Sequence, residues 1–228
     1  RQMCIRDRVR GGGKYDHAFT PTSVLPRQGG GKKWMLRGLP RGFLLGRPMR
    51  LYLNRFLGAA MLDVKLYQEV AAEPRFLNQA WITVLIYAML ASWGSFGRAG
   101  AIGSNIGLVT AVIGWYVWAF STYYCAVKWF RETPAEVERG DRKTVMRVMG
   151  FACAPGAIRL LGLLPGMGIL ALVVSSVWMI AAATVGLKTA FHFESTARAA
   201  GACIIGWIIG AIAQGLLLVT LFQVFGAS

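Results

Sequence analysis

Residues 148–187 read VMGFACAPGAIRLLGLLPGMGILALVVSSVWMIAAATVGL, and Arg159 is the only charged residue in these forty positions. A transmembrane helix needs about 20 apolar residues to cross roughly 30 Å of hydrocarbon, so this run is too long for one crossing and suits two. Gly162, Pro165 and Gly166 interrupt it near the middle. The stretch therefore predicts two membrane-spanning helices joined by a very tight turn.

Three more uncharged runs lie outside this stretch, at residues 76–97, 99–127 and 199–228. Each must form a helix if it crosses a bilayer, because lipid offers no partner for unpaired backbone N–H and C=O groups. The expected spans are residues 80–96, 105–127, 145–164, 167–187 and 202–225. The sequence therefore predicts an all-α, polytopic membrane helical bundle with five transmembrane helices. A soluble helical bundle is the alternative that so many apolar runs disfavour.

Composition agrees with this fold class. Of the 228 residues, 55% are hydrophobic and 15% are charged, whereas a soluble domain carries about 25% charged residues. The net charge is +15, and residues 1–78 hold 15 Lys/Arg against 5 Asp/Glu. A basic excess placed before the first apolar run suits a cytoplasmic segment beside an anionic membrane better than a nucleic-acid groove. We therefore expect the lipid bilayer as a partner and no nucleic acid.

Topology is predicted from the basic residues near the span ends. The segment before the first span and the second and fourth loops carry most of them, whereas the third loop and the C-terminus are uncharged and Arg98 stands alone on that side. Lys and Arg accumulate in cytoplasmic loops. The sequence predicts a cytoplasmic N-terminus and an external C-terminus.

Three regions are expected along the chain. Residues 1–48 are rich in Gly, Arg and Pro without a hydrophobic period, which predicts a disordered basic tail, part of it spurious translation upstream of a start at Met35, Met49 or Met61. Residues 49–78 form a juxtamembrane segment, and residues 79–228 form the membrane domain.

Within the juxtamembrane segment, Leu62, Leu66 and Val70 recur every four residues. This spacing predicts a short amphipathic helix in the membrane interface that Pro74 ends. A cytoplasmic extension of the first span is the alternative.

Four short motifs resemble bacterial members of the Yip1 family. They lie at residues 67–74 (Tyr-x-Glu-Val-x-x-Glu-Pro), 150–156 (Gly-Phe-Ala-x-Ala-Pro-Gly), 159–165 (Arg-Leu-Leu-Gly-Leu-Leu-Pro) and 177–179 (Val-Trp-Met). The resemblance covers about residues 61–225 and implies a five-span membrane protein with a cytoplasmic N-terminus and a short external C-terminus. It makes Glu69 and Pro74 candidate functional positions.

Eukaryotic relatives of this family are associated with Rab GTPases and with vesicle traffic. Their acidic-aromatic motif of the Asp-Leu-Tyr-Gly-Pro type is absent here, and Glu73-Pro74 is only a faint counterpart. A Rab-type GTPase is therefore not an expected partner.

Arg159 is the strongest candidate among the spans. An arginine at the bilayer centre costs about 2.5–3.5 kcal/mol on insertion scales and is often functional. No Asp or Glu lies in any expected span. Three roles are open: snorkelling or hydrogen bonding to carbonyls freed near Pro165, contact with an anion or substrate, and contact with a partner subunit.

Two helix features add candidate packing positions. Pro155 should kink the third span and leave a carbonyl near Phe151 unpaired, and broken helices at the midplane are typical of transporters. Gly206 and Gly210 form a G-x-x-x-G ridge that lets backbones approach closely, either within the molecule or in a homo-oligomer.

No catalytic, cofactor-binding or metal-binding residues are expected. His192 and Glu194 form an isolated His-x-Glu, and two ligands are too few for a catalytic zinc site, which takes three from the protein. The first functional hypothesis is therefore a non-catalytic membrane scaffold or adaptor that acts through helix packing and its cytoplasmic face, with a membrane-protein partner. The alternative is a small transporter or channel component that uses the kinked third span and Arg159.

Overall fold

The computed structural model describes residues 41–130 and 140–225, without the side chains of residues 41–48 and 96–99. The described residues form helices and no strand. In chain order these are α1 (Arg41–Ala60), α2 (Val64–Ala72), η1 (Pro74–Phe76), α3 (Leu77–Lys128), α5 (Arg142–Phe151), η2 (Ala154–Leu163), α6 (Gly168–Phe191) and α7 (Thr196–Phe225). The prediction for residues 1–40 lies outside the described residues.

Five segments of the described chain are long and apolar enough to cross a membrane. They are Pro74–Ser95, Gly100–Lys128, Arg142–Leu163, Gly168–Phe191 and Thr196–Phe225. These spans confirm the predicted five-span, all-α membrane protein. The first two are parts of α3, separated where Gly100 adopts φ 64° and ψ −169°, a backbone conformation that a residue with a β-carbon rarely adopts.

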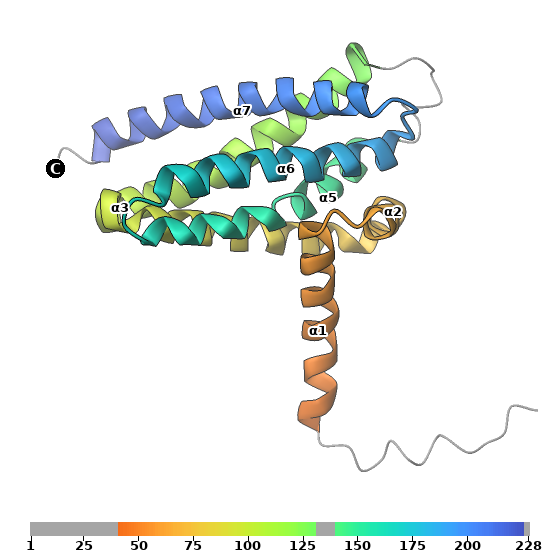
Figure 1. Cartoon of the computed structure of the whole chain (residues 1–228), viewed down its shortest axis with the longest axis horizontal. Coiled ribbons are helices and arrows are strands. Elements are labelled where there is room, and N and C mark those ends of the chain that lie inside the picture. Colours follow the sequence, from red (N-terminus) through yellow and green to blue (C-terminus); the bar gives the residue numbers. More distant parts are fainter. Residues whose placement is uncertain (1–40, 131–139, 226–228) are drawn as a thin grey trace, which may run out of the picture. The chain divides into compact units, whose positions relative to one another are not determined.

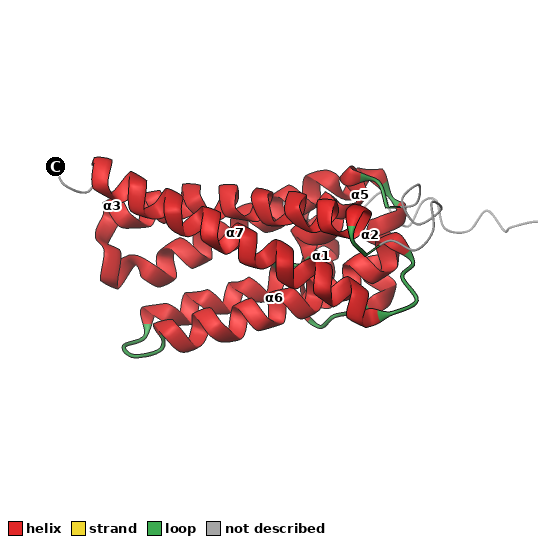
Figure 2. Cartoon of the chain, turned by 90° about the horizontal axis from the view of Figure 1, so that it is seen from above, coloured by secondary structure: helices red, strands yellow, loops and turns green. Residues whose placement is uncertain are grey.

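The spans pair in two groups. Helix α7 packs along the second half of α3, and η2 packs on the first half of α3 beside α6. Figures 1 and 2 both show α7 running alongside α3, and Figure 1 shows η2 alongside α6. Helix α2 and the turn between α6 and α7 lie at one end of this arrangement, and the last residues of α7 lie at the other (Figure 1).

The expected amphipathic helix is α2, and its apolar face is covered by protein. Asp63 caps its first turn, because its Oδ1 accepts a hydrogen bond from the backbone N–H of Lys65 at 2.9 Å. Leu66, Tyr67 and Val70 are buried, and α2 packs on α5 and α6. Figure 1 shows α2 nearly end-on while α6 and α7 run across the view, so α2 lies across the direction of the spans.

A buried arginine holds the C-terminal end of α2. Arg147 of α5 is 5% exposed and donates to the carbonyl oxygens of Val70 at 3.1 Å and Ala71 at 2.7 Å, and to Thr144 Oγ1 at 2.9 Å. The last carbonyls of a helix have no partner within the helix, and a cation there interacts well with the helix dipole. Arg147 therefore fixes α2 against the third span.

Helix α1 is an element that the sequence did not predict, and it begins within the predicted tail of residues 1–48. Polar contacts with α2, α3 and α6 attach it to the other helices. The Tyr52 hydroxyl lies 3.0 Å from Thr83 Oγ1, Arg55 Nη2 lies 2.9 Å from Glu69 Oε1, and the Trp178 indole N–H donates to the Ala60 carbonyl at 2.8 Å. Burial raises the pKa of Tyr52, so the hydroxyl stays protonated at neutral pH.

Candidate intramembrane ligand site

The third span changes helix type at its proline. Helix α5 ends at Phe151 and the 3-10 helix η2 begins at Ala154. Pro155 therefore lies in the first turn of η2. A backbone N–H has no acceptor within the helix at that position, so the missing N–H of proline removes no hydrogen bond. Ala152 N–H still bonds four residues back to Val148, whereas Gly156 N–H bonds three residues back to Cys153. The helix therefore tightens at Pro155 instead of forming the simple kink that the sequence predicted.

Glycines set the position of η2 against the first half of α3. A β-carbon on Gly94 would overlap the carbonyl oxygen of Arg159, and one on Gly162 would lie 2.7 Å from the carbonyl oxygen of Gly94. A β-carbon on Gly156 would likewise overlap the ring of Tyr87. The two backbones thus touch without intervening side chains, as small residues permit between membrane helices. This contact fixes where the Arg159 side chain starts.

Arg159 is oriented by two serines of α6. Its Nε donates to Ser175 Oγ at 3.1 Å and its Nη2 to Ser176 Oγ at 3.4 Å, and its Cζ lies 5.3 Å from the centre of the Tyr87 ring. One hypothesis from the sequence was that Arg159 bonds to backbone carbonyls near Pro165. These hydrogen bonds instead go to the two serine hydroxyls. They use only part of the guanidinium, which carries five N–H groups.

No described carboxylate pairs with Arg159. The two ion pairs among the described residues join Arg55 to Glu69 and Arg75 to Glu73, on α1, α2 and η1. Ser175 is seven residues from the start of α6 at Gly168, which places it roughly 10 Å inside that span. Because no counter-ion lies within the described chain, a cation at this depth can bind an anion.

The guanidinium separates two cavities. The first, here called the polar cavity, has a volume of about 590 Å³ and is lined by Ser92, Ser95, Thr110, Gln214 and several glycines. The second, the aromatic cavity, has a volume of about 510 Å³ and is lined by Tyr87, Trp115, Trp118, Met179 and Trp207. Arg159, Leu172, Gln214 and Leu218 line both.

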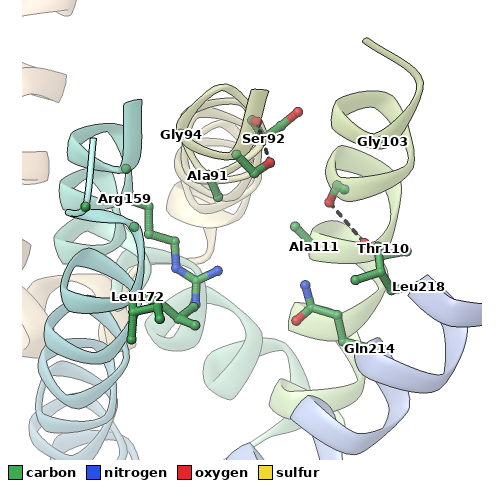
Figure 3. A pocket seen from close by; sticks show the side chains of 16 residues that line it. Ala91, Ser92, Gly94, Gly103, Thr110, Ala111, Arg159, Leu172, Gln214 and Leu218 are labelled. Atoms are coloured by element: carbon green, nitrogen blue, oxygen red, sulfur yellow. Dashed lines mark hydrogen bonds between the residues drawn. The ribbon is translucent and has the colours of Figure 1, made fainter. Parts of the chain in front are cut away.

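Figure 3 shows how the polar cavity is built. The Arg159 side chain points from η2 into the space between helices, and the Gln214 amide points into the same space from α7. No hydrogen bond joins Gln214 to the other side chains drawn there. Ile169, Leu172 and Leu218 at the rim are 77%, 48% and 39% exposed. The opening is therefore bordered by apolar side chains on the surface that a bilayer would cover.

The other predicted positions lie away from this space or only border it. Pro165 is exposed in the turn between η2 and α6, next to Gly166 at φ 79°. Glu69 pairs with Arg55, and Pro74 begins η1, both at the α2 end. The structure thus places Arg159 and Pro155 together on η2. Pro165, Glu69 and Pro74 lie elsewhere.

The glycine ridge of α7 faces the interior of the molecule. A β-carbon on Gly206 would overlap Thr122, and one on Gly210 would lie 2.9 Å from Cβ of Trp118. The Trp118 indole N–H donates to the carbonyl of Cys203 at 3.1 Å beside them. Of the two roles left open for this ridge, the structure shows packing of α7 on α3.

Several residues of the site had weak or no signal in the sequence. Thr110 and Gln214 line the polar cavity, whereas Asn105, another polar residue of the second span, is exposed and its amide donates to the Ala101 carbonyl at 3.0 Å. Ser175 and Ser176 were missed. Two adjacent serines in a run as apolar as the fourth span were the signal that could have marked them as partners of Arg159.

The Yip1 domain family model matches residues 64–218, more than half of the chain. The chain belongs to the Yip1 domain family. The match confirms the resemblance that the short motifs indicated, and it begins at the first residue of α2. All residues lining the two cavities of this Yip1-domain protein fall within the match. No curated protein and no solved structure matches the chain at a significant level.

Proposed function

We propose that this Yip1-domain protein binds an anionic ligand inside the bilayer at Arg159, as a small transporter or a component of one. The observation that carries the proposal is the guanidinium of Arg159, which lies between two cavities without a carboxylate partner among the described residues. Intramembrane ionisable residues that face a cavity typically mark a substrate or ion pathway.

The surrounding groups support an anion in preference to a cation. Arginine is the residue suited to carboxylate and phosphate groups because its planar fork donates two parallel hydrogen bonds. Gln214 supplies a further N–H donor from the opposite helix. The serines that hold Arg159 are neutral, so they orient the guanidinium without cancelling its charge.

A scaffold or adaptor, the first hypothesis from the sequence, has less support. That hypothesis relied on helix packing and the cytoplasmic face, and α3 covers the ridge of Gly206 and Gly210 that could have packed against a partner. A ligand-binding role uses the cavities, the partly buried charge of Arg159 and the polar groups together. We further propose that the protein is not an enzyme, because the site contains a cation and amides but no general base or nucleophile paired with one.

For orientation we propose the arrangement inferred from charge, with the N-terminal side of α2 in the cytoplasm of a prokaryote and the end of α7 outside. The support is that Lys65, Arg75, Lys128, Lys188 and Arg198 all lie near span ends on the α2 side. In this orientation the polar cavity lies in the outer half of the membrane.

Ligand binding can be tested by the unfolding midpoint of purified protein in a neutral detergent. The probes are inorganic phosphate, decanoate and a short-chain phosphatidic acid, and the variants are Arg159→Gln and Arg159→Lys. A ligand that binds only the folded state raises the midpoint. We expect at least one anion to raise it by several degrees in the natural protein, less in Arg159→Lys and not in Arg159→Gln.

Lys143→Gln is the control, because Lys143 is an exposed cation at the start of α5 and its loss should leave the shift unchanged. If Arg159→Gln does not fold, Gly107→Leu replaces it, since Gly107 lines the polar cavity and nothing lies within 4 Å of a β-carbon there. An equal shift in the natural protein and in Arg159→Gln or Gly107→Leu contradicts the proposal. The absence of a shift with any of the anions contradicts it as well.

A further inference from the structure

The two cavities follow one another along α6 in a definite order. The polar cavity is lined by Gly168, Ile169 and Leu172, at the start of the helix, and the aromatic cavity by Leu172, Ser176 and Ile180, further along it. Leu172 to Ile180 spans eight residues, roughly 12 Å of helix. Both walls are mainly apolar, but Ser92, Ser95 and Thr110 of α3 line only the first cavity, whereas aromatic side chains line only the second.

Arg159 stands where the polar part meets the apolar part. It lines both cavities with Leu172, Gln214 and Leu218, so the two cavities adjoin at the guanidinium. Beyond it the walls are large apolar or aromatic side chains, among them Trp115 and Trp118, both almost fully buried. A free inorganic anion would use the guanidinium but would leave the aromatic cavity without an occupant.

The order of polar groups, charge and apolar space, from the end of the span inward, matches an amphiphile in a membrane leaflet. The headgroup of such a molecule lies at the membrane surface and its chain extends inward. The rim supports the same route, because exposed Ile169, Leu172 and Leu218 border the opening. A hydrocarbon chain can pass such a rim from the bilayer without leaving an apolar environment.

We propose that the ligand is an anionic lipid-like amphiphile, with its phosphate or carboxylate at Arg159 and Gln214 and its chain in the aromatic cavity. This inference rests on the proposed function and names the ligand class of the same site. It predicts that affinity requires both the charge and the chain, because the charge contacts Arg159 and the chain fills the aromatic cavity beside it.

Two glycines allow the two cavities to be filled separately. Gly107 lines only the polar cavity and Gly215 only the aromatic cavity, and a β-carbon at either position meets no atom within 4 Å. Leucine at these positions should therefore occupy space without displacing protein, and it should also favour the helix over glycine. Ala181→Leu is the matched control, because Ala181 is exposed on α6 and lines neither cavity.

The experiment measures binding to the full-length protein in neutral detergent, by the shift in unfolding midpoint. The probes are myristoyl lysophosphatidic acid, the matching lysophosphatidylcholine, myristate and inorganic phosphate. Comparing the lysophosphatidic acid with myristate distinguishes a phospholipid headgroup from a free fatty acid. We expect the anionic amphiphiles to bind at least about tenfold more tightly than the other two probes. Gly215→Leu and Arg159→Gln should each remove this preference, and Ala181→Leu should keep it.

The outcomes separate the two proposals. If inorganic phosphate binds the natural protein as tightly as the amphiphiles, and Gly215→Leu binds both as before, the amphiphile inference is wrong and anion binding at Arg159 stands. If Arg159→Gln binds every probe like the natural protein, both proposals are wrong. Equal binding of lysophosphatidylcholine and lysophosphatidic acid would overturn the requirement for a net negative charge.

Discussion

Two arginines lie inside the third span, and their surroundings indicate a structural role for one and a binding role for the other. Arg147 is buried and bonds to two backbone carbonyls and a threonine, so its donors serve the attachment of α2. Arg159 bonds to two serine hydroxyls and faces a hollow. The first residue is expected to matter for stability and the second for binding.

Replacing Arg147 by glutamine should destabilise the protein. Hydrogen bonds from a charged donor contribute about 1.5–3 kcal/mol each, and the carbonyls of Val70 and Ala71 would lose theirs. We expect a loss of roughly 2–4 kcal/mol and an unfolding midpoint several degrees lower in detergent. Lys143→Gln, which removes an exposed charge of the same helix, should change the midpoint little. Equal midpoints for the two variants would show that Arg147 does not hold α2.

The sequence identified Arg159 because a lone charge in forty apolar positions is conspicuous. It could not identify the partners of Arg159, because Ser175 and Ser176 lie on another helix and meet it only through the turn at Pro165 and Gly166. The role of Arg147 could not be predicted for the same reason. Its carbonyl acceptors belong to α2, 76 and 77 positions earlier, and no periodicity connects them.

At the scale of elements, the spans were predictable and their internal geometry was not. Hydrocarbon requires about 20 apolar residues in a helix regardless of packing, so uncharged runs located all five spans. The change from α5 to η2 depends on Pro155 and on the close contact of Gly94 with the Arg159 backbone, which is a tertiary effect. Helix α1 was missed because its arginines and Pro48 obscure an apolar period.

The contact between α3 and α7 gives a prediction at this scale. Gly206→Leu and Gly210→Leu should destabilise the fold, because each side chain would meet the α3 backbone or Trp118, and overpacking costs about 1–3 kcal/mol or more. Gly215→Leu, in the same helix but in open space, is the control and should leave the unfolding midpoint unchanged or higher. Size-exclusion of the same samples would reveal an alternative. A smaller oligomer at an unchanged midpoint would place the ridge between copies.

At the scale of the molecule, charge is segregated between the two ends of the spans. Among the described residues, the charged residues other than Arg98 and Arg159 lie on α1, α2 and η1, at the neighbouring ends of α3, α5, α6 and α7, or in the short segments beside them. The turn between η2 and α6 carries none. This asymmetry is what makes the topology predictable, since basic loops remain on the cytoplasmic side.

If all five spans cross the membrane, α7 crosses it once. The loop between α6 and α7 and the end of α7 should therefore lie in opposite compartments. A reporter that requires export, fused after Phe225, should be active in a prokaryotic host, and the same reporter inserted between α6 and α7 should be inactive. A cytoplasmic fluorescent reporter at the same two positions should give the reverse pattern. Activity of one reporter at both positions would refute the five-span arrangement.

Native mass spectrometry of the protein released from neutral detergent can detect a lipid-like anion bound at Arg159. For the natural protein we predict a bound mass corresponding to one anionic lipid, retained after extensive washing. The Arg159→Gln variant, with the same fold by circular dichroism, should lack that mass. An identical set of bound lipids in both proteins, or a natural protein that carries none, would contradict the account.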